Sequence, residues 1–454
     1  MKASSAIRTL LHLAIPLTCV QVAEGMVNVV DTLMMGRLGS VALAGGGLGA
    51  IIFWTCLALF SGLLEMTGAL AAEAYGAGQE ARVGVITSQA LLLSLVVSMP
   101  TMVVCWHLDV GLLALGQDPQ IVAATMAYLR AILWGLPAAL GLFVFKEITT
   151  ALMQPRLLTV LMVGSIPANI FFNDALMYGK WGLPQLGLAG IGWSSVLIFW
   201  SMFGAIALRL RLRSDLQRWA LFRFIGRLQP SVLRQIVHLG WPLCVDYGTE
   251  FGALTVAALM MGWWGTDWLA AHRIVMTTTE VLLMFSWGLS YATAMSTAHQ
   301  IGAARPDKAQ RLMGLSLLLN GAVVGLLAMP LWLMPATITS FYIDTRLVEN
   351  QMIVQSAISL FKVGVVFQIF QGFRLISLGT LQGLHDTHLL ALIDFGAHWA
   401  IGIGGGYLLG QTLHGQGLGL WWGLAGGQLV AALLLAYRVQ FLLHRRIQAR
   451  SDIL

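Results

Sequence analysis

Apolar residues follow one another along this chain in long, nearly unbroken stretches, separated by short clusters of Gly, Pro and charged residues. A helix needs roughly 20 mostly apolar residues to cross a bilayer, and the separating clusters divide the chain into about twelve such stretches. The predicted spans are 8-35, 46-72, 84-107, 119-152, 157-178, 187-208, 232-262, 268-298, 310-336, 348-381, 387-410 and 418-441. The stretches are too long for strands of a membrane barrel, and an open sheet cannot span lipid. The pattern therefore predicts an all-α integral membrane protein with about 12 transmembrane helices.

Composition agrees with a membrane protein, because 58% of the 454 residues are hydrophobic and only 10% are charged. A soluble domain carries about 25% charged residues, so this chain has too little polar surface to fold in water. The start of the chain is similar to a secretory signal, since Lys2 and Arg8 precede an apolar stretch. That stretch continues through Met35 without a small-residue cleavage pattern. We interpret it as a retained first transmembrane helix.

Lys and Arg are distributed unequally between the two sets of loops and tails. Counting from an N-terminus inside, 18 of the 26 fall on one side and 3 (Arg37, Lys180 and Arg346) on the other. The positive-inside rule then predicts that both termini are cytoplasmic, in a multi-pass protein of a bacterial inner (plasma) membrane. Because these basic residues fringe the helices and do not form a patch interleaved with aromatics, we expect the lipid bilayer and no nucleic acid as a partner.

An internal repeat divides the chain into two halves. The segment HLAIPLTCVQVAEGMVNVVDTLMMGRLG, which begins at His12, aligns without gaps on HLGWPLCVDYGTEFGALTVAALMMGWWG, which begins at His238, at an offset of 226 residues. This alignment pairs Pro16 with Pro242 and Glu24 with Glu250. At an offset of 228 residues, FKEITTALMQ from Phe145 matches FRLISLGTLQ from Phe373, which pairs Lys146 with Arg374.

Six helices in each half is an even number, so both halves enter the membrane in the same orientation, as in transporters built from parallel repeats. The predicted domains are an N-terminal lobe at 1-212, an Arg-rich cytoplasmic linker at 213-231 and a C-terminal lobe at 232-454. The linker lies either on the membrane surface or in solvent.

Charged residues inside the predicted spans are the candidates for function, because each costs about 2.5 to 3.5 kcal/mol on insertion. In the first half, Glu24 and Asp31 are seven residues apart and share one helical face. Two carboxylates in one cavity are suited to accept a proton. They also form the nucleus of a sodium site at Asp31 if the oxygens of Asn169, Asn173 and Thr32 converge on it. The alternative is a structural pair in which one of the two acids is held by Lys146.

In the second half, Asp246 and Glu250 are four residues apart and also share a face. We expect Arg374 to pair with one of these two acids, and Arg273 to neutralise Glu280 seven residues further along the same helix. Gln371 precedes Arg374 by three residues. The substrate cavity is predicted to contain five residues: Asp246, Glu250, Gln371, Arg374 and Glu280.

Enzyme motifs are absent or weak in this sequence. It contains no Walker loop, HExxH or GxSxG motif, and HDTH at 385-388 is interpreted as a solvated turn. We therefore predict a protein that is not an enzyme and has no cofactor other than a coupling ion, H+ or Na+.

Six stretches of the chain resemble the MATE family, the multidrug and toxic compound extrusion antiporters, with a closer likeness to the NorM-like branch. They include PLTCVQVAEGMVNVVDTLMMGRLGS, AAEAYGAG, NIFFNDALMYGKWGLPQLGLAGIGW and LGTLQGLHDT, and they run over nearly the whole length. The resemblance places the family aspartate of helix 1 on Asp31, the glutamate of helix 7 on Glu250 and the asparagines of helix 5 on Asn169 and Asn173.

The resemblance implies two six-helix lobes that alternate access and export amphipathic, often cationic compounds in exchange for inward H+ or Na+. The chain departs from the family pattern at Gln371, where NorM-like members often have an acid, and at Arg273, where the family usually has Gln. These departures weaken the case for a sodium site in the second half and leave the site around Asp31 intact. We expect a monomer that binds small molecules. A flippase for lipid-linked saccharides, an intramembrane enzyme and a passive channel are the alternatives.

Overall fold

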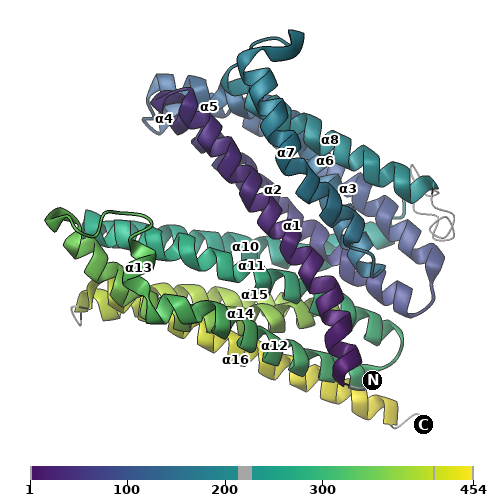
Figure 1. The fold of residues 1–454 in the computed structure, drawn as a ribbon. Helices are drawn as coiled ribbons and strands as arrows, with labels where there is room; N and C mark the ends of the chain where they lie inside the picture. The colour runs from purple at the N-terminus through teal and green to yellow at the C-terminus, as the bar shows by residue number, and fades with distance from the viewer. Residues whose placement is uncertain (1–2, 213–227, 413–414, 452–454) are drawn as a thin grey trace. The chain divides into compact units, whose positions relative to one another are not determined.

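The computed structural model describes the chain except for residues 1–2, 213–227, 413–414 and 452–454 (Figure 1). All regular structure in the described residues is helical, which confirms the predicted all-α class. The α-helices are α1 (Ala3–Arg37), α2 (Ser40–Gly76), α3 (Glu80–Trp106), α4 (Leu108–Ala114), α5 (Pro119–Ile132), α6 (Leu136–Ala151), α7 (Arg156–Tyr178), α8 (Leu188–Leu212), α10 (Pro230–Trp263), α11 (Thr266–Gly302), α12 (Pro306–Leu333), α13 (Pro335–Thr339), α14 (Gln351–Gly383), α15 (His388–Phe395) and α16 (Gln416–Ser451). Short 3-10 turns occupy η1 (Leu133–Gly135), η2 (Lys180–Gly182) and η3 (Val348–Asn350), and π-helical segments occupy η4 (Gly396–Gly405) and η5 (Leu408–Thr412).

Eleven helical segments among the described residues are long and apolar enough to cross a membrane, and each corresponds to a predicted span. The remaining predicted span, 268-298, corresponds to α11, which is 37 residues long. This helix carries Arg273, Glu280 and several Ser and Thr residues, of which Ser290 and Thr293 are buried. Polar side chains in a membrane helix generally face the protein interior. The helix thus has the length of a span and buries polar groups that lower its hydropathy.

Two predicted spans are interrupted helices. The span predicted at 119-152 consists of α5, the turn η1 and α6, which begins with Leu136 and Pro137. Proline has no backbone N–H to donate to the preceding turn, so a local change of helix geometry before it is expected. The span predicted at 387-410 begins as α15 and continues through the π-helical η4 and η5.

Packing divides the chain into two compact units, and the dividing points lie inside helices. One, here called the N-terminal unit, contains Cys19–Cys244; the other, the C-terminal unit, contains Met1–Thr18 with Val245–Leu454. Both dividing points come two residues after a proline, Pro16 in α1 and Pro242 in α10. They are also 226 residues apart, the same offset as the sequence repeat. Most of the predicted linker, 213-227, lies outside the described residues.

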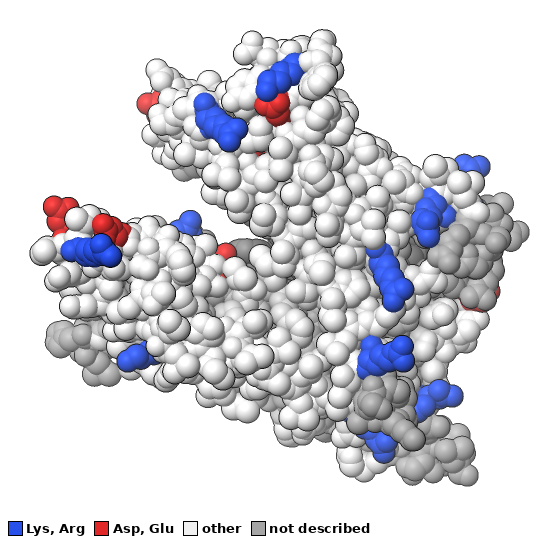
Figure 2. Space-filling model, viewed as in Figure 1, with Lys and Arg blue, Asp and Glu red and all other residues white. Residues whose placement is uncertain are grey.

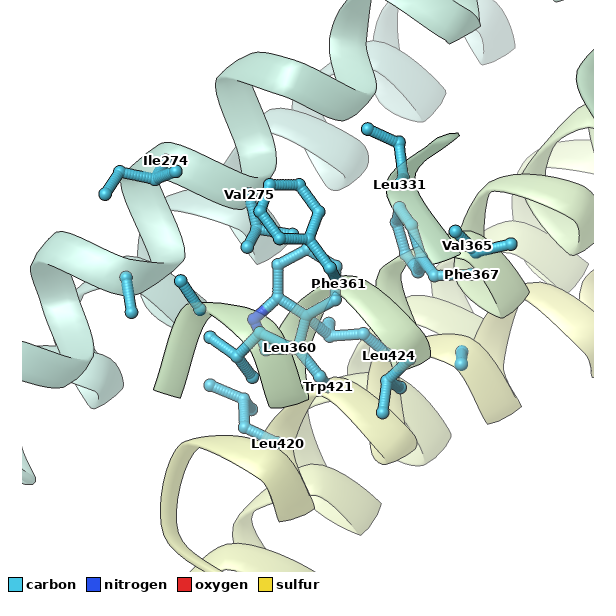
Figure 3. Packing of buried hydrophobic residues seen from close by; sticks show 14 of the residues in the cluster. Ile274, Val275, Leu331, Leu360, Phe361, Val365, Phe367, Leu420, Trp421 and Leu424 are labelled. Atoms are coloured by element: carbon cyan, nitrogen blue, oxygen red, sulfur yellow. The ribbon is translucent and has the colours of Figure 1, made fainter. Parts of the chain in front are cut away.

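The core of the C-terminal unit forms where α11, α14 and α16 pack side by side (Figure 3). Trp421 of α16 is fully buried there, with Phe361 and Phe367 of α14 around it. The Trp421 and Phe367 rings meet edge to face with centroids 5.7 Å apart, and the indole N–H donates to His272 at 3.2 Å. Aromatic pairs of this geometry add about 0.5–1.5 kcal/mol beyond the area that they bury.

Close approach of two backbones holds α16 against the π-helical segment η4. A Cβ at Gly423 would overlap the backbone of Gly406, and one at Gly427 would lie 2.5 Å from the carbonyl oxygen of Ala397. Helices in lipid associate through such small-residue contacts, because the hydrophobic effect supplies no force between them. The contact fixes the position of α15 and η4, which carry Asp394 and His398.

In the view of Figure 2, most Lys, Arg, Asp and Glu side chains lie towards the two ends of the helices, and the surface between them is mostly white. This distribution agrees with a protein whose helices cross the apolar layer of a membrane.

We predict that Gly423→Ala destabilises the protein by about 1–3 kcal/mol, because the added methyl group must separate α16 from η4. Thermal unfolding of the purified protein in detergent measures the effect. Gly426→Ala is the matched control, since its Cβ would meet only the Ile401 side chain, at 3.9 Å. Equal melting temperatures for the two variants would contradict the backbone contact described above.

Candidate functional site

Asp31 lies in α1 within the N-terminal unit and is bound by two asparagine side chains of α7. Its Oδ1 atom accepts hydrogen bonds from Nδ2 of Asn173 at 2.7 Å and from Nδ2 of Asn169 at 3.0 Å. Asn169 and Asn173 are four residues apart, so they share one face of α7, and a 3.1 Å bond from Nδ2 of Asn173 to Oδ1 of Asn169 links them. Both are fully buried and Asp31 is 7% exposed. The three predicted residues therefore meet, but the asparagines present amide nitrogens to Asp31 and not the oxygens that were expected.

A small cavity of about 30 Å³ adjoins Asp31 and is lined by both predicted acids, Asp31 and Glu24. Tyr128, Ser165 and Ser195 contribute further polar side chains to its wall. A cavity of this size holds about one water-sized ligand. It has room for a proton-carrying water or a small cation and is too small for a drug molecule.

Thr32 does not contribute to the cavity, contrary to the sequence-based expectation. Its side chain is exposed, and Oγ1 donates to the backbone carbonyl of Asn28 at 2.8 Å. Adjacent residues on a helix point about 100° apart, so a neighbour of Asp31 in sequence is not its neighbour in space.

Lys146 acts on two acids of the N-terminal unit, Glu147 and Glu24, whereas Asp31 is bound by the asparagines. The Lys146 Nζ atom is 3.9 Å from Oε1 of Glu147 and 4.1 Å from the centre of the Phe143 ring. Its charge also acts on Glu24. If Lys146 holds one of the two predicted acids in a structural pair, that acid is therefore Glu24 and not Asp31.

Arg374 of α14 is the centre of a second group of charges, in the C-terminal unit. Its Nη2 atom is 2.8 Å from Oε2 of Glu250, which confirms the expected pairing with an acid of α10. Nη1 is 4.0 Å from Oδ1 of Asp246, the other candidate. Gln371 donates from Nε2 to Oε1 of Glu250 at 2.9 Å. Arg374 is fully buried.

Asp394 and His398 belong to the same group of charges but were not among the predicted site residues. Oδ2 of Asp394 is 2.7 Å from Nη1 of Arg374, the shortest of the three distances between this arginine and an acid. His398 Nδ1 is 2.8 Å from the backbone oxygen of Asp394, and its Nε2 is 3.2 Å from Nε2 of Gln428. The signal for this pair was present, because two polar residues four apart interrupt an apolar span.

Glu280 lies apart from the Arg374 group. Its side chain and that of Arg273 are exposed on α11, and no ion pair of 4.0 Å or less joins them among the described residues. The expected structural pairing of Arg273 with Glu280 is therefore wrong, although the charge of Arg273 still acts on Glu280.

The sequence repeat extends to these charges. Glu24 and Lys146 of the N-terminal unit are the counterparts of Glu250 and Arg374 of the C-terminal unit. In each unit the basic residue acts on the repeated glutamate, through a 2.8 Å ion pair in the C-terminal unit and through space in the N-terminal unit. A repeated helical membrane fold with a buried, amide-bound carboxylate beside a water-sized cavity is typical of membrane transporters.

Comparisons with known proteins identify the family. The MatE family model matches residues 16–175 and 242–408, so the chain belongs to the MATE family. It is 35% identical to "Probable multidrug resistance protein NorM" of Synechococcus sp., over 94% of this chain and 92% of that protein. It is 32% identical to the probable NorM of Pseudomonas aeruginosa, over 94% and 88%. The protein is thus a multi-pass membrane transporter and not an enzyme.

Solved structures support the same fold. The structure of a MATE protein in the bent conformation matches with a TM-score of 0.89 at 16% identity, over 99% of both chains. An outward-facing MATE family transporter matches with a TM-score of 0.84 at 19% identity, over 97% of this chain and 99% of that one.

We predict that Arg374→Gln destabilises the C-terminal unit by about 3–5 kcal/mol, because it leaves buried carboxylates without their cation. Adding Glu250→Gln should restore part of this loss. Thermal unfolding in detergent measures both effects, and Arg346→Gln, a change of an exposed arginine, is the control. If Arg374→Gln unfolds at the temperature of the control, the charge group does not stabilise the unit.

Proposed function

We propose that the protein is a secondary antiporter that exports amphipathic, often cationic compounds in exchange for inward H+ or Na+. Membership of the MATE family and the likeness to relatives named multidrug resistance proteins support this proposal. The observation that carries it is the site of Asp31: one buried carboxylate, held by two neutral amides and adjoining a water-sized cavity.

Neutral partners let Asp31 respond to a cation. A carboxylate fixed by a lysine or arginine is already neutralised, whereas Asn169 and Asn173 donate hydrogen bonds and carry no charge. A proton or Na+ that enters the cavity therefore meets an uncompensated negative charge. When the cation binds, this charge is cancelled and the hydrogen bonds from α7 to α1 weaken.

Sodium has suitable ligands at the same place. Hard cations prefer oxygen ligands, and Oδ1 of Asn173 is buried without a hydrogen-bond partner among the described residues. Together with the Asp31 carboxylate it offers two oxygens to a cation. The same group also suits a proton, so both ions remain in the proposal.

Glu24 and Glu250 are proposed to contribute in different ways. Glu24 lines the same cavity as Asp31, on the same face of α1, so it is suited to pass a cation to or from Asp31. Glu250 is bound by Arg374 and Gln371, so its contribution to transport is proposed to pass through these two side chains.

Glu280 is proposed as an acidic contact for cationic substrates, because among the expected residues of the substrate cavity it is the exposed one. Asp246, Gln371 and Arg374 are at most 3% exposed, so a substrate would reach them only after a conformational change.

The proposed topology places both termini in the cytoplasm of a bacterium, with the protein in the inner membrane as a monomer. The unequal distribution of Lys and Arg supports this orientation. The start of α1 and the end of α16 also lie at the same end of the C-terminal unit in Figure 1.

Exchange follows if the cation and the substrate favour different conformations. A ligand shifts a conformational equilibrium only by its difference in affinity for the two states. One elementary charge that crosses a potential of about 100 mV releases about 2.3 kcal/mol, so one or two cations can sustain a substantial substrate gradient.

We predict that Asp31→Asn abolishes gradient-driven efflux of cationic dyes from proteoliposomes, because an amide binds neither H+ nor Na+ strongly. Imposed pH and sodium gradients, applied separately, identify the coupling ion. Asp174→Asn is the matched control, since Asp174 is a partly exposed acid of α7 that pairs with Lys180 at 2.8 Å. Full efflux in both Asp31→Asn and Glu250→Gln would refute the proposed coupling roles.

A further inference from the structure

The C-terminal unit buries more negative than positive charge. Arg374 and Asp394 are fully buried, Asp246 is 3% exposed and Glu250 is 7% exposed. All three acids lie within 4.0 Å of the one guanidinium group. If every acid were ionised, the group would carry two negative charges in excess. An uncompensated charge in a membrane-spanning segment is costly, so additional positive charge is favoured here.

Arg374 bonds two of the three acids directly. Nη2 and Nη1 reach Glu250 and Asp394 at 2.8 and 2.7 Å, within hydrogen-bond distance. Asp246 is 4.0 Å from Nη1, beyond that distance. Asp246 is therefore the acid that Arg374 compensates least.

The oxygens of Asp246 and Asp394 also need a donor. Oδ1 of each is buried without a hydrogen-bond partner among the described residues. The two carboxyl groups face the same Nη1 atom of Arg374, at 4.0 Å for Asp246 and 2.7 Å for Asp394, so they are close neighbours. We infer that a hydrogen bond joins their side chains. Ionised carboxylates are only acceptors, so such a bond forms only if one of the two carries a proton. A single shared proton satisfies both oxygens and halves the excess charge.

A metal ion suits this group poorly. Among the described residues, no three His, Cys, Asp or Glu side chains are arranged to hold a metal. The guanidinium already stands between the acids and would repel a second cation.

Among the described residues, His398 is a further titratable group beside these acids, and its hydrogen bonds suit a neutral ring. Nδ1 faces the backbone oxygen of Asp394 and needs a proton to donate to it. Nε2 faces the amide nitrogen of Gln428, which donates to it. A neutral imidazole with its proton on Nδ1 satisfies both contacts, which leaves the pair of acids as the place for added positive charge.

We propose that Asp246 and Asp394 share one proton and form a proton-binding site within the C-terminal unit, with Arg374 as a fixed counter-ion. For its role in transport, the site rests on the proposed antiport, to which it adds a second coupling site specific for protons. Proton binding itself does not depend on that function.

Infrared spectroscopy of the purified protein in detergent, without gradient or substrate, tests the site. At neutral pH exposed acids are ionised, so the carbonyl stretch of a protonated carboxyl group reports buried acids. We expect Asp246→Asn and Asp394→Asn each to remove the same band, and Glu349→Gln, a change of an exposed acid, to keep it. If Asp246→Asn keeps the full band, the proposal is wrong. Asp246→Asn decides the test if Asp394→Asn fails to fold, because Asp246 makes no direct bond to Arg374.

A transport measurement then separates this site from the site of Asp31. In proteoliposomes, we expect Asp246→Asn to lower the number of protons exchanged per dye molecule, whereas Asp31→Asn abolishes efflux. Glu349→Gln, a change of an exposed acid, is the control that keeps both efflux and this ratio. An unchanged proton-to-dye ratio in Asp246→Asn would overturn the coupling role. If the wild-type protein transports no dye while the infrared band behaves as expected, the antiport proposal fails and the proton site remains.

Discussion

The cost of placing charge in an apolar layer governs the arrangement of this protein. In the C-terminal unit, that cost is met by a guanidinium group that bonds Glu250 and Asp394 and lies near Asp246. Arginine suits this role because its planar fork binds two carboxylates at once and keeps its proton. The fully buried core around Trp421 and the glycine contact between Gly423 and Gly406 hold the helices that carry these groups. The packing of this unit therefore serves the placement of its charges.

The two units meet the same constraint differently. The counterpart of Arg374 in the sequence repeat is Lys146, a point charge beside Glu147 and the Phe143 ring. Asp31 stands apart from it, on the neutral amides of Asn169 and Asn173. In the proposed transport cycle the N-terminal unit thus has a carboxylate that is free to change its charge. In the C-terminal unit, by contrast, Arg374 holds two of the three buried carboxylates, Glu250 and Asp394, in direct bonds.

Much of this fold could be predicted from the sequence, because hydropathy and the positions of Gly and Pro depend on local sequence. The sequence repeat also predicted part of the charge arrangement. It matches Lys146 with Arg374 and Glu24 with Glu250, which indicates a basic residue near a glutamate in each half. Asp394 could not be placed beside Arg374, because its position depends on the π-helical segment η4 and on its contact with α16. Thr32 failed as a ligand for a local reason, since its hydroxyl bonds the backbone of its own helix. The exposed Arg273 and Glu280 show that seven-residue spacing places two charges on one face without bringing them into contact.

The positions of the prolines connect the repeat to the way the chain divides. Pro16 and Pro242 are repeat counterparts, and each lies two residues before the point where its helix passes from one packing unit to the other. Proline removes the backbone hydrogen bond to the turn before it, so each of these helices lacks one such bond near the point where it passes between units. Glu24 and Asp31 follow the first proline, and Asp246 and Glu250 follow the second. The acids of both candidate sites therefore lie on the parts of α1 and α10 that follow these prolines, so each proline separates its acids from the helix start, which belongs to the other packing unit.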